Sequence, residues 1–185
     1  MYTKTLMANV DYDAADILIL GGGDGALLAQ LITDHKPAMV TMVELDGAVM
    51  RVVGDHMASV TLNTGVLDNH QSDNYQIITG DAIQYLEECG KDDKQFDFIF
   101  GDLTDVPIDT DTEAKELWDF IAKILRLSFS RVKIRGKYLT HVSGKSLPAV
   151  RKTFQSKVEE ISCQLNRNVV VEFSGSALKT LKTTT

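Results

Sequence analysis

Short apolar runs alternate with segments of helical period along the chain. Four runs are too short for helices and have the composition of buried parallel strands. They lie at residues 16–20, 39–43, 75–78 and 96–100. Apolar residues recur at helical spacing between them, which indicates helices over 24–34 and 48–57 and from Asp81 to about Glu88. This alternation predicts an α/β fold with a doubly wound, mainly parallel sheet.

The second part of the chain continues the pattern. It predicts a helix over 113–131, a strand over 137–142, a long helix over 146–165 and a last strand over 169–173. Residues 59–74 are polar and contain Gly65, and we interpret them as a surface insertion. We therefore expect one domain over residues 1–178, followed by a disordered tail at 179–185 that is rich in lysine and threonine.

A glycine-rich turn follows the first strand, in the sequence D-I-L-I-L-G-G-G-D-G at residues 16–25. A strand, a glycine turn and a helix together form the opening unit of nucleotide-binding α/β sheets. Asp24 is unusual in this turn, because its carboxylate would repel the phosphate that such a turn normally binds. The turn therefore favours a cationic ligand.

Composition narrows the function classes. The 185 residues are 44% hydrophobic and carry a net charge of −7, which argues against an extended contact with nucleic acid. No apolar stretch approaches the roughly 20 residues of a membrane span, and no signal peptide is evident. Cys89 and Cys163 lie far apart, as is typical of reduced thiols in a cytoplasmic protein.

Acidic residues follow each of the first four predicted strands. They are Asp24, Glu44 with Asp46, Asp81, and Asp102 with Asp105. The carboxyl ends of parallel strands meet at one edge of the sheet, where ligands bind. Each acid could instead cap the helix that follows it. Because the acids occur after four consecutive strands, we favour a shared site, and a bound polycation would relieve their mutual repulsion. The histidines show no metal-ligand spacing, so we expect no metal.

Glu44 lies 20 residues beyond Asp24, at the end of the second strand. An acid at this place accepts hydrogen bonds from ribose hydroxyls in both dinucleotide and S-adenosyl sites. An NAD-dependent oxidoreductase is therefore an alternative, which Asp24 disfavours.

Five segments resemble the aminopropyltransferase family, from Tyr2 to about Thr140. The segments are Y-T-K-T-L-M at 2–7, I-L-I-L-G-G-G-D-G at 17–25, K-P-A-M-V-T-M-V-E-L-D at 36–46, G-D-A at 80–82 and D-L-T-D-V-P-I at 102–108. The last segment is similar to the spermine synthase branch rather than to the D-S-S-D loop of spermidine synthases.

The resemblance implies a Rossmann-like fold of the S-adenosylmethionine-dependent methyltransferase type. It implies transfer of an aminopropyl group from decarboxylated S-adenosylmethionine to spermidine, with no further cofactor. The implied catalytic base is Asp102. The implied polyamine-binding residues are Tyr2, Asp24 and Asp105, and the implied nucleoside-binding residues are Gly21, Gly22, Gly23, Glu44, Asp46, Asp81, Ala82 and Leu103. The implied partners are these small molecules, with a homodimer in full-length relatives.

Family members carry a β-rich segment before this domain and a further strand after it. We can align neither with this chain, so we expect both to be missing from it. Two alternatives remain open beside a spermine synthase. They are a spermidine synthase that acts on putrescine, and an inactive relative that binds nucleoside and polyamine without turnover.

Overall fold

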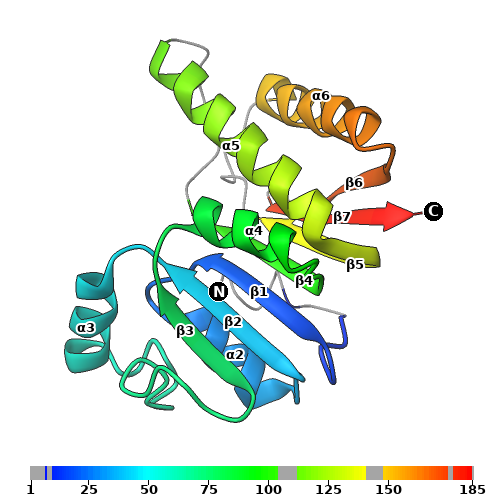
Figure 1. Ribbon diagram of the computed structural model, residues 1–185. Coiled ribbons are helices and arrows are strands. Elements are labelled where there is room, and N and C mark those ends of the chain that lie inside the picture. Colours follow the sequence, from blue (N-terminus) through cyan, green and yellow to red (C-terminus); the bar gives the residue numbers. More distant parts are fainter. Residues whose placement is uncertain (1–6, 8–9, 104–111, 141–147, 175–176, 185) are drawn as a thin grey trace.

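A computed structural model describes residues 7, 10–103, 112–140, 148–174 and 177–184. Seven strands form one sheet in the order β3-β2-β1-β4-β5-β7-β6 (Figure 1). The strands are β1 (Asp16–Gly21), β2 (Met39–Glu44), β3 (Tyr75–Thr79), β4 (Phe96–Asp102), β5 (Val132–Thr140), β6 (Asn168–Ser174) and β7 (Ala177–Thr184). The helices are α2 (Ala26–Asp34), α3 (Gly47–His56), α4 (Ala82–Lys91), α5 (Thr112–Arg131) and α6 (Pro148–Gln164).

The sheet is mainly parallel. Strands β3, β2, β1, β4 and β5 pair in parallel, whereas β7 is antiparallel to both β5 and β6. The strands β1 to β4 coincide with the four apolar runs of the sequence to within two residues. The predicted α/β class and doubly wound arrangement are confirmed.

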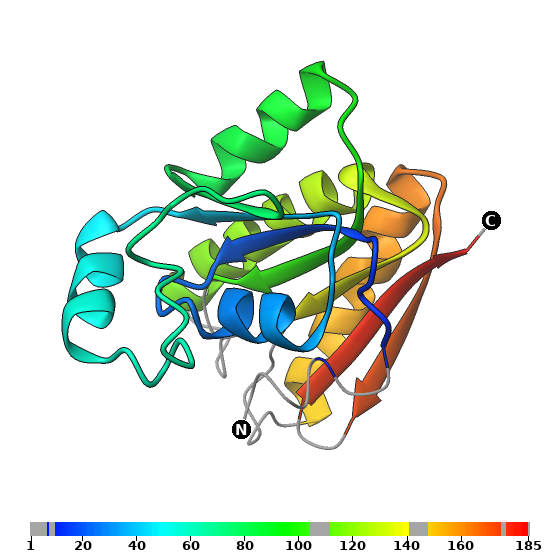
Figure 2. The same cartoon turned by 90° about the horizontal axis from the view of Figure 1, so that it is seen from below.

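Two apolar layers pack against opposite faces of the sheet. One contains buried residues of α4, α5 and α6, including Leu86, Phe129 and Phe154. The other contains Leu28 and Leu31 of α2 together with residues of α3. Figure 2 shows α2 and α4 on opposite sides of the sheet. Burial on both faces explains why β1 reads as an uninterrupted apolar run rather than an alternating one.

Helix α2 begins two residues later than the sequence predicts. Gly25 precedes it with a φ of 66°, in the left-handed region that glycine adopts without strain. A Cβ at Gly25 would also lie 2.9 Å from Cδ2 of Leu67. The turn therefore extends through Gly25, and the helix starts at Ala26.

Residues 59–74 are not simply a surface insertion, so that interpretation is corrected. Val66 and Leu67 are buried and belong to the apolar layer on the α2 face. Gln71 forms an isolated bridge with Gln76 at the start of β3. The segment is polar overall because it also contains several exposed turns.

Strand β5 begins five residues before the predicted start. Phe96 pairs with Val132 and Phe98 with Lys137, so the ladder contains a bulge at residues 133–136. Arg135 has a φ of 69° within this bulge. The Arg135-Gly136 dipeptide thus marks a bulge inside the strand rather than a turn before it.

The last strand of the sheet corrects the predicted tail. Residues 177–184 form β7, which lies between β5 and β6. The prediction that residues 179–185 are disordered is therefore wrong for 179–184. A strand also occupies the place after β6 where we expected one to be missing.

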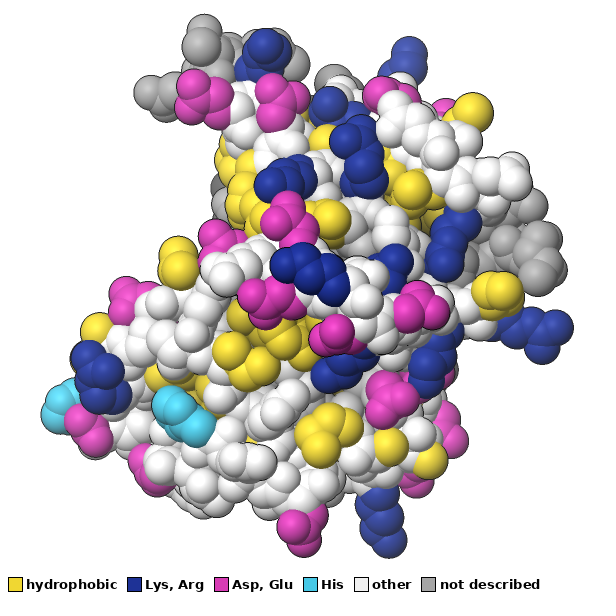
Figure 3. Space-filling view, in the orientation of Figure 1, with side chains coloured by type: hydrophobic (Ala, Val, Ile, Leu, Met, Phe, Trp, Pro, Cys, Tyr) yellow, Lys and Arg dark blue, Asp and Glu magenta, His cyan; other side chains and the backbone are white. Residues whose placement is uncertain are grey.

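Basic and acidic side chains intermix over α4 and α5 on the face shown in Figure 3. Cys89 is buried and Cys163 is exposed, and both are free thiols. Among the described residues, no helix combines the length and apolar character that crossing a bilayer requires.

Candidate active site

An open cleft of about 710 Å³ lies at the carboxyl ends of β1, β2, β3 and β4. It is lined by Gly21, Val43, Glu44, Leu45, Asp46, Gly80, Asp81, Ala82, Ile83, Asp102, Leu103 and Phe120. Ligand sites in open α/β sheets occur at this edge. The cleft therefore has the position of a small-molecule site.

The glycine turn closes against the end of β4. Gly21 is the register partner of Asp102 and has a φ of 85°. A Cβ at Gly21 would lie 2.2 Å from the backbone oxygen of Asp102, and one at Gly22 would lie 3.9 Å from its Oδ2. Only glycine allows the two strand ends to approach this closely, and the approach brings the Asp102 carboxylate beside the turn.

The half-buried Glu44 connects three loops of the cleft. Its Oε1 accepts a hydrogen bond from the backbone N–H of Asp46 at 2.9 Å, and its backbone oxygen accepts one from Gly80 at 2.9 Å. Its Oε2 points to the glycine turn, since a Cβ at Gly23 would lie 2.9 Å from it. These contacts fix the carboxylate at the centre of the strand ends.

Asp46 and Asp81 cap the helices that follow them. Asp46 accepts a hydrogen bond from the N–H of Ala48 at 2.8 Å, at the start of α3. Asp81 accepts hydrogen bonds from Ile83 and Gln84 at 2.6 and 3.2 Å, at the start of α4. Capping, the alternative interpretation of these acids, is confirmed for both, and both also line the cleft.

The cleft is acidic. Four carboxylates line it, and none of its described lining residues is a lysine or arginine. Carboxylates gathered in this way attract a cation and repel an anion. Leu103, Ile83 and Phe120 contribute an apolar wall. The arrangement can therefore hold a molecule with a flat apolar part, several hydroxyls and a positive charge.

The structure brings together most of the residues that the sequence singled out. Gly21, Glu44, Asp46, Asp81, Ala82, Asp102 and Leu103 line the cleft, and Gly22 and Gly23 lie directly behind Asp102 and Glu44. Asp24 is exposed, does not line the cleft and accepts a hydrogen bond from the N–H of Ala26 at 3.0 Å. Tyr2 and Asp105 lie outside the described residues.

Phe120, which lines the cleft from α5, was not predicted from the sequence. Its position falls outside the apolar stripe of that helix, which includes Trp118, Ile121 and Ile124, and its side chain is 36% exposed. An aromatic residue that lies outside the apolar stripe of its helix is the sequence signal that could have found it.

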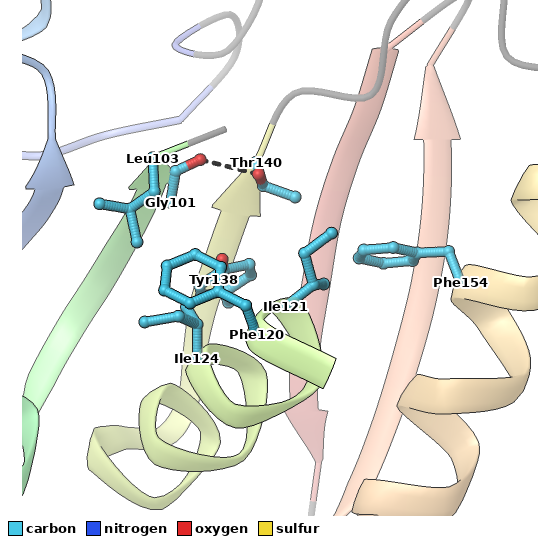
Figure 4. A pocket seen from close by; sticks show the side chains of 8 residues that line it. All are labelled: Gly101, Leu103, Phe120, Ile121, Ile124, Tyr138, Thr140 and Phe154. Carbon is cyan, nitrogen blue, oxygen red and sulfur yellow. Dashed lines mark hydrogen bonds between the residues drawn. The ribbon is translucent and has the colours of Figure 1, made fainter. Parts of the chain in front are cut away.

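A narrow apolar crevice adjoins the cleft and shares Leu103 and Phe120 with it (Figure 4). Gly101, which directly precedes Asp102, lines it together with Tyr138 and Thr140. Burial raises the pKa of the Tyr138 hydroxyl well above its usual value, and the negative charge of Asp102 raises it further. Tyr138 is therefore a neutral phenol throughout the physiological range.

A second group of ligand-type side chains lies away from the cleft. Asp11, Asp13 and His35 place one potential metal-ligand atom each within 4.8 Å of the others. Asp11 and Asp13 are exposed, and one Asp13 oxygen already accepts a hydrogen bond from the N–H of Lys36 at 2.8 Å. Asp11 and Asp13 lie in a surface hollow with Asp97 and Phe98, at the beginning of β4 rather than at its carboxyl end.

Comparison with known proteins agrees with this geometry. The family model described as "Spermine/spermidine synthase domain" matches residues 4–142. Polyamine aminopropyltransferase 1 of Hyperthermus butylicus is 33% identical over 89 residues, which cover 48% of this chain and 29% of that protein. The polyamine aminopropyltransferase of Korarchaeum cryptofilum is 29% identical over 158 residues, which cover 84% of this chain and 43% of that protein.

Solved structures share the fold. A spermidine synthase in complex with the transition-state analogue AdoDATO matches with a TM-score of 0.68 at 18% identity, over 100% of this chain and 61% of that one. The spermidine synthase from Thermotoga maritima has a TM-score of 0.65 at 16% identity, over 100% of this chain and 59% of that one. At these identities the match shows the fold alone.

The chain spans less than half the length of the curated relatives described above. The family model nevertheless covers the glycine turn, all the strand-end acids and the described walls of the cleft. The chain therefore belongs to the spermine/spermidine synthase family.

Proposed function

We propose that the chain carries the catalytic part of an aminopropyltransferase. In this proposal it transfers an aminopropyl group from decarboxylated S-adenosylmethionine to spermidine and releases spermine and methylthioadenosine. The observation that carries the proposal is the acidic cleft, where Glu44, Asp81 and Asp102 meet at one sheet edge. Both substrates are cationic, so the charge of the cleft matches them.

The nucleoside half of the donor fits the part of the cleft between β2, β3 and α5. Glu44 accepts hydrogen bonds from the ribose hydroxyls, and Asp81 with Ala82 contacts the adenine. The backbone of Gly21, Gly22 and Gly23 passes close to the ligand, and Asp46 closes the ribose side. The support for this placement is the set of contacts that fixes Glu44 and the apolar wall that includes Leu103.

Asp102 acts as the base in this proposal. The attacking amine is mostly protonated at neutral pH, because amines of this kind have a pKa near that of lysine, about 10. Asp102 holds the amine and accepts its proton. The nitrogen lone pair forms the new N–C bond, and the C–S electron pair returns to the sulfonium sulfur, which leaves as a neutral thioether. The leaving group is already activated, so this step requires no metal or further cofactor.

The remaining polyamine contacts are also proposals. Asp24, in the glycine turn beside the cleft, repels the carboxylate of ordinary S-adenosylmethionine through its charge, which gives selectivity for the decarboxylated donor. Tyr2 and Asp105 contact the acceptor. The partners are these small molecules rather than nucleic acid or membrane, in a cytoplasmic protein that forms a homodimer at full length.

Spermidine synthesis from putrescine is the second candidate. Both solved structures described above are spermidine synthases, which favours it. The sequence D-L-T-D-V-P-I at residues 102–108 favours spermidine as the acceptor instead, because it resembles the spermine synthase loop.

Mass spectrometry of the products tests these proposals. The protein is incubated with decarboxylated S-adenosylmethionine and either spermidine or putrescine, with the Asp102→Asn variant as the control. We expect spermine and methylthioadenosine from spermidine, both lost in the variant. Spermidine formed from putrescine would establish the second candidate. A folded protein that binds methylthioadenosine but makes no product would instead be a binding relative without turnover.

A further inference from the structure

The peptide unit that leads into Asp102 is held by two buried hydroxyl-bearing side chains of β5. Gly101 is the register partner of Thr140, and Ile99 is the partner of Tyr138. Tyr138 and Thr140 are two residues apart on one strand, so their side chains project from the same face of the sheet. Both are buried, and both line the crevice that adjoins the cleft.

Thr140 fixes the orientation of this peptide. Its Oγ1 donates a hydrogen bond of 2.7 Å to the backbone oxygen of Gly101, as Figure 4 shows. That oxygen belongs to the peptide bond between Gly101 and Asp102. Rotation of this peptide would break the hydrogen bond and leave a buried carbonyl without it, which is costly. The Thr140 hydroxyl therefore restrains the direction in which the Asp102 side chain departs.

Tyr138 restrains the same peptide because its phenol packs against Gly101. A Cβ at Gly101 would lie 2.0 Å from the Tyr138 Oη and 2.7 Å from its Cζ. The phenol thus occupies the space that any other residue at position 101 would need. Its ring is held by an edge contact with Phe129, with ring centroids 5.9 Å apart.

Gly21 supports the opposite side of Asp102. The backbone oxygen of Asp102 would lie 2.2 Å from a Cβ at Gly21, so that glycine packs directly against the residue. Asp102 is thus held between the glycine turn of β1 and the two hydroxyl side chains of β5. A carboxylate that takes a proton from an amine must be placed to within a fraction of an ångström, since a displacement of 1 Å can cost about 100-fold in rate.

We propose that Thr140 and Tyr138 are positioning residues that set the Asp102 carboxylate through the Gly101–Asp102 peptide. The inference rests on the proposed function, in which Asp102 is the base. Neither side chain needs to contact the substrates. Their contribution is to orient the base, so their loss slows turnover more than it weakens binding.

Substitution of Thr140 tests this with a conservative rescue. Thr140→Val keeps the shape and removes the hydroxyl, whereas Thr140→Ser keeps the hydroxyl. We expect Thr140→Val to lower kcat about tenfold or more, with the KM for the donor and the Kd for methylthioadenosine within twofold of the parent. Thr140→Ser restores most of kcat. Tyr138→Phe, which keeps the ring, lowers kcat in the same direction.

Ser128→Ala is the matched control. Ser128 is also a buried hydroxyl residue, on α5, and its Oγ has no hydrogen-bond partner among the described residues. We expect this variant to keep kcat within twofold. Thermal melting of every variant separates loss of folding from loss of positioning. Unchanged kcat in Thr140→Val, or no recovery in Thr140→Ser, would overturn the inference.

A crystal structure of the Thr140→Val protein supplies a readout that needs no turnover. We expect the Gly101 carbonyl to be rotated and the Asp102 carboxylate to be displaced. An unmoved peptide would refute the positioning role even if the parent protein were active. If the parent protein makes no product, the proposed function fails, and this structure still decides whether Thr140 orients Asp102.

Discussion

At the scale of single residues, Gly23 leaves room for the Glu44 carboxylate, which a side chain at this position would displace. The two carboxylate oxygens of Glu44 have different environments. Oε1 accepts the N–H of Asp46, while Oε2 faces Gly23. A side chain at position 23 would meet Oε2 at 2.9 Å and the carboxyl carbon at 3.0 Å. The end of a glutamate side chain can move away, so the protein would still fold while the carboxylate left its place.

We therefore predict that Gly23→Ala impairs nucleoside binding and has little effect on stability. In the proposed function, displacement of Glu44 removes hydrogen bonds from the ribose to a charged acceptor, each worth about 1.5–3 kcal/mol, so the Kd for methylthioadenosine should rise at least tenfold. Titration calorimetry measures this. Gly90→Ala is the control, because nothing lies within 4 Å of a Cβ at this position of α4. It should leave the Kd unchanged and stabilise the helix by about 0.5–1 kcal/mol. An unchanged Kd in Gly23→Ala would contradict the role of Glu44.

At the scale of elements, Asp81 joins helix α4 to the cleft. Its carboxylate caps the helix and also lines the cleft, so one substitution cannot separate the two roles. Asp81→Ser keeps a capping oxygen but has a shorter, neutral side chain. Asp81→Ala removes both functions. We predict a loss of about 1 kcal/mol in the free energy of unfolding for alanine and almost none for serine.

Both variants should bind methylthioadenosine more weakly if the carboxylate also contacts adenine. Urea unfolding and calorimetry on the same samples separate the two effects. Normal nucleoside binding by Asp81→Ser would show that Asp81 is a cap only.

The elements that the sequence predicted best are those whose pattern has a single interpretation. The apolar runs that become β1 and β2 are buried on both faces, so composition alone identifies them as strands. The sequence of β7 is A-L-K-T-L-K-T-T, without the apolar run or strict alternation that marks a strand. It pairs with β5 and β6 through backbone groups, which the side-chain pattern does not reveal.

The acids of the candidate site could also be predicted from the sequence, whereas its other residues could not. Acids that follow parallel strands must gather at one edge, so Glu44, Asp81 and Asp102 follow from topology. Phe120 belongs to α5, in the layer with α4 and α6, and whether it reaches the cleft depends on how that helix packs. The contact between Tyr138 and Gly101 depends on the register of β4 and β5, which a bulge shifts. No local pattern encodes that register.

At the scale of the whole molecule, Lys133 joins three strands at the end of the sheet opposite the cleft. Its Nζ lies 3.0 Å from Asp16 and 2.9 Å from Asp97, which belong to β1 and β4. Hydrogen bonding to Asp97 is the largest cause that raises the pKa of Lys133 above its ordinary value of 10.5, and Asp16 adds to it. A raised pKa in the folded state means that protonated Lys133 stabilises the protein below about pH 10. This contribution is lost as the pH rises through the folded-state pKa.

We predict that Lys133→Met lowers the free energy of unfolding by about 1 kcal/mol at pH 7, since the pair is partly exposed and screened. The difference from the parent protein should shrink above pH 10.5. Urea unfolding at both pH values measures it, and Lys152→Met, at an exposed position of α6, serves as control. A pH-independent difference would assign the effect to packing of the lysine stem rather than to its charge.

Strand β7 decides whether the sheet is continuous from β3 to β6. It lies between β5 and β6: it pairs with β6 along its length, and Leu181 and Lys182 also pair with β5, so proline within this part of the strand disrupts the sheet. Lys182 pairs with Lys137 of β5 and with Val170 of β6. Lys182→Pro should therefore destabilise the protein by about 2 kcal/mol, because it removes a backbone donor inside the sheet. Lys182→Ala keeps that donor and should stay within about 0.5 kcal/mol of the parent.

A disordered segment would tolerate both substitutions equally, so equal stability of the two variants in urea unfolding would exclude β7. Slow hydrogen exchange at the amides of Leu181 and Lys182 in the parent protein would support the strand independently, because ladder amides exchange only when the structure opens.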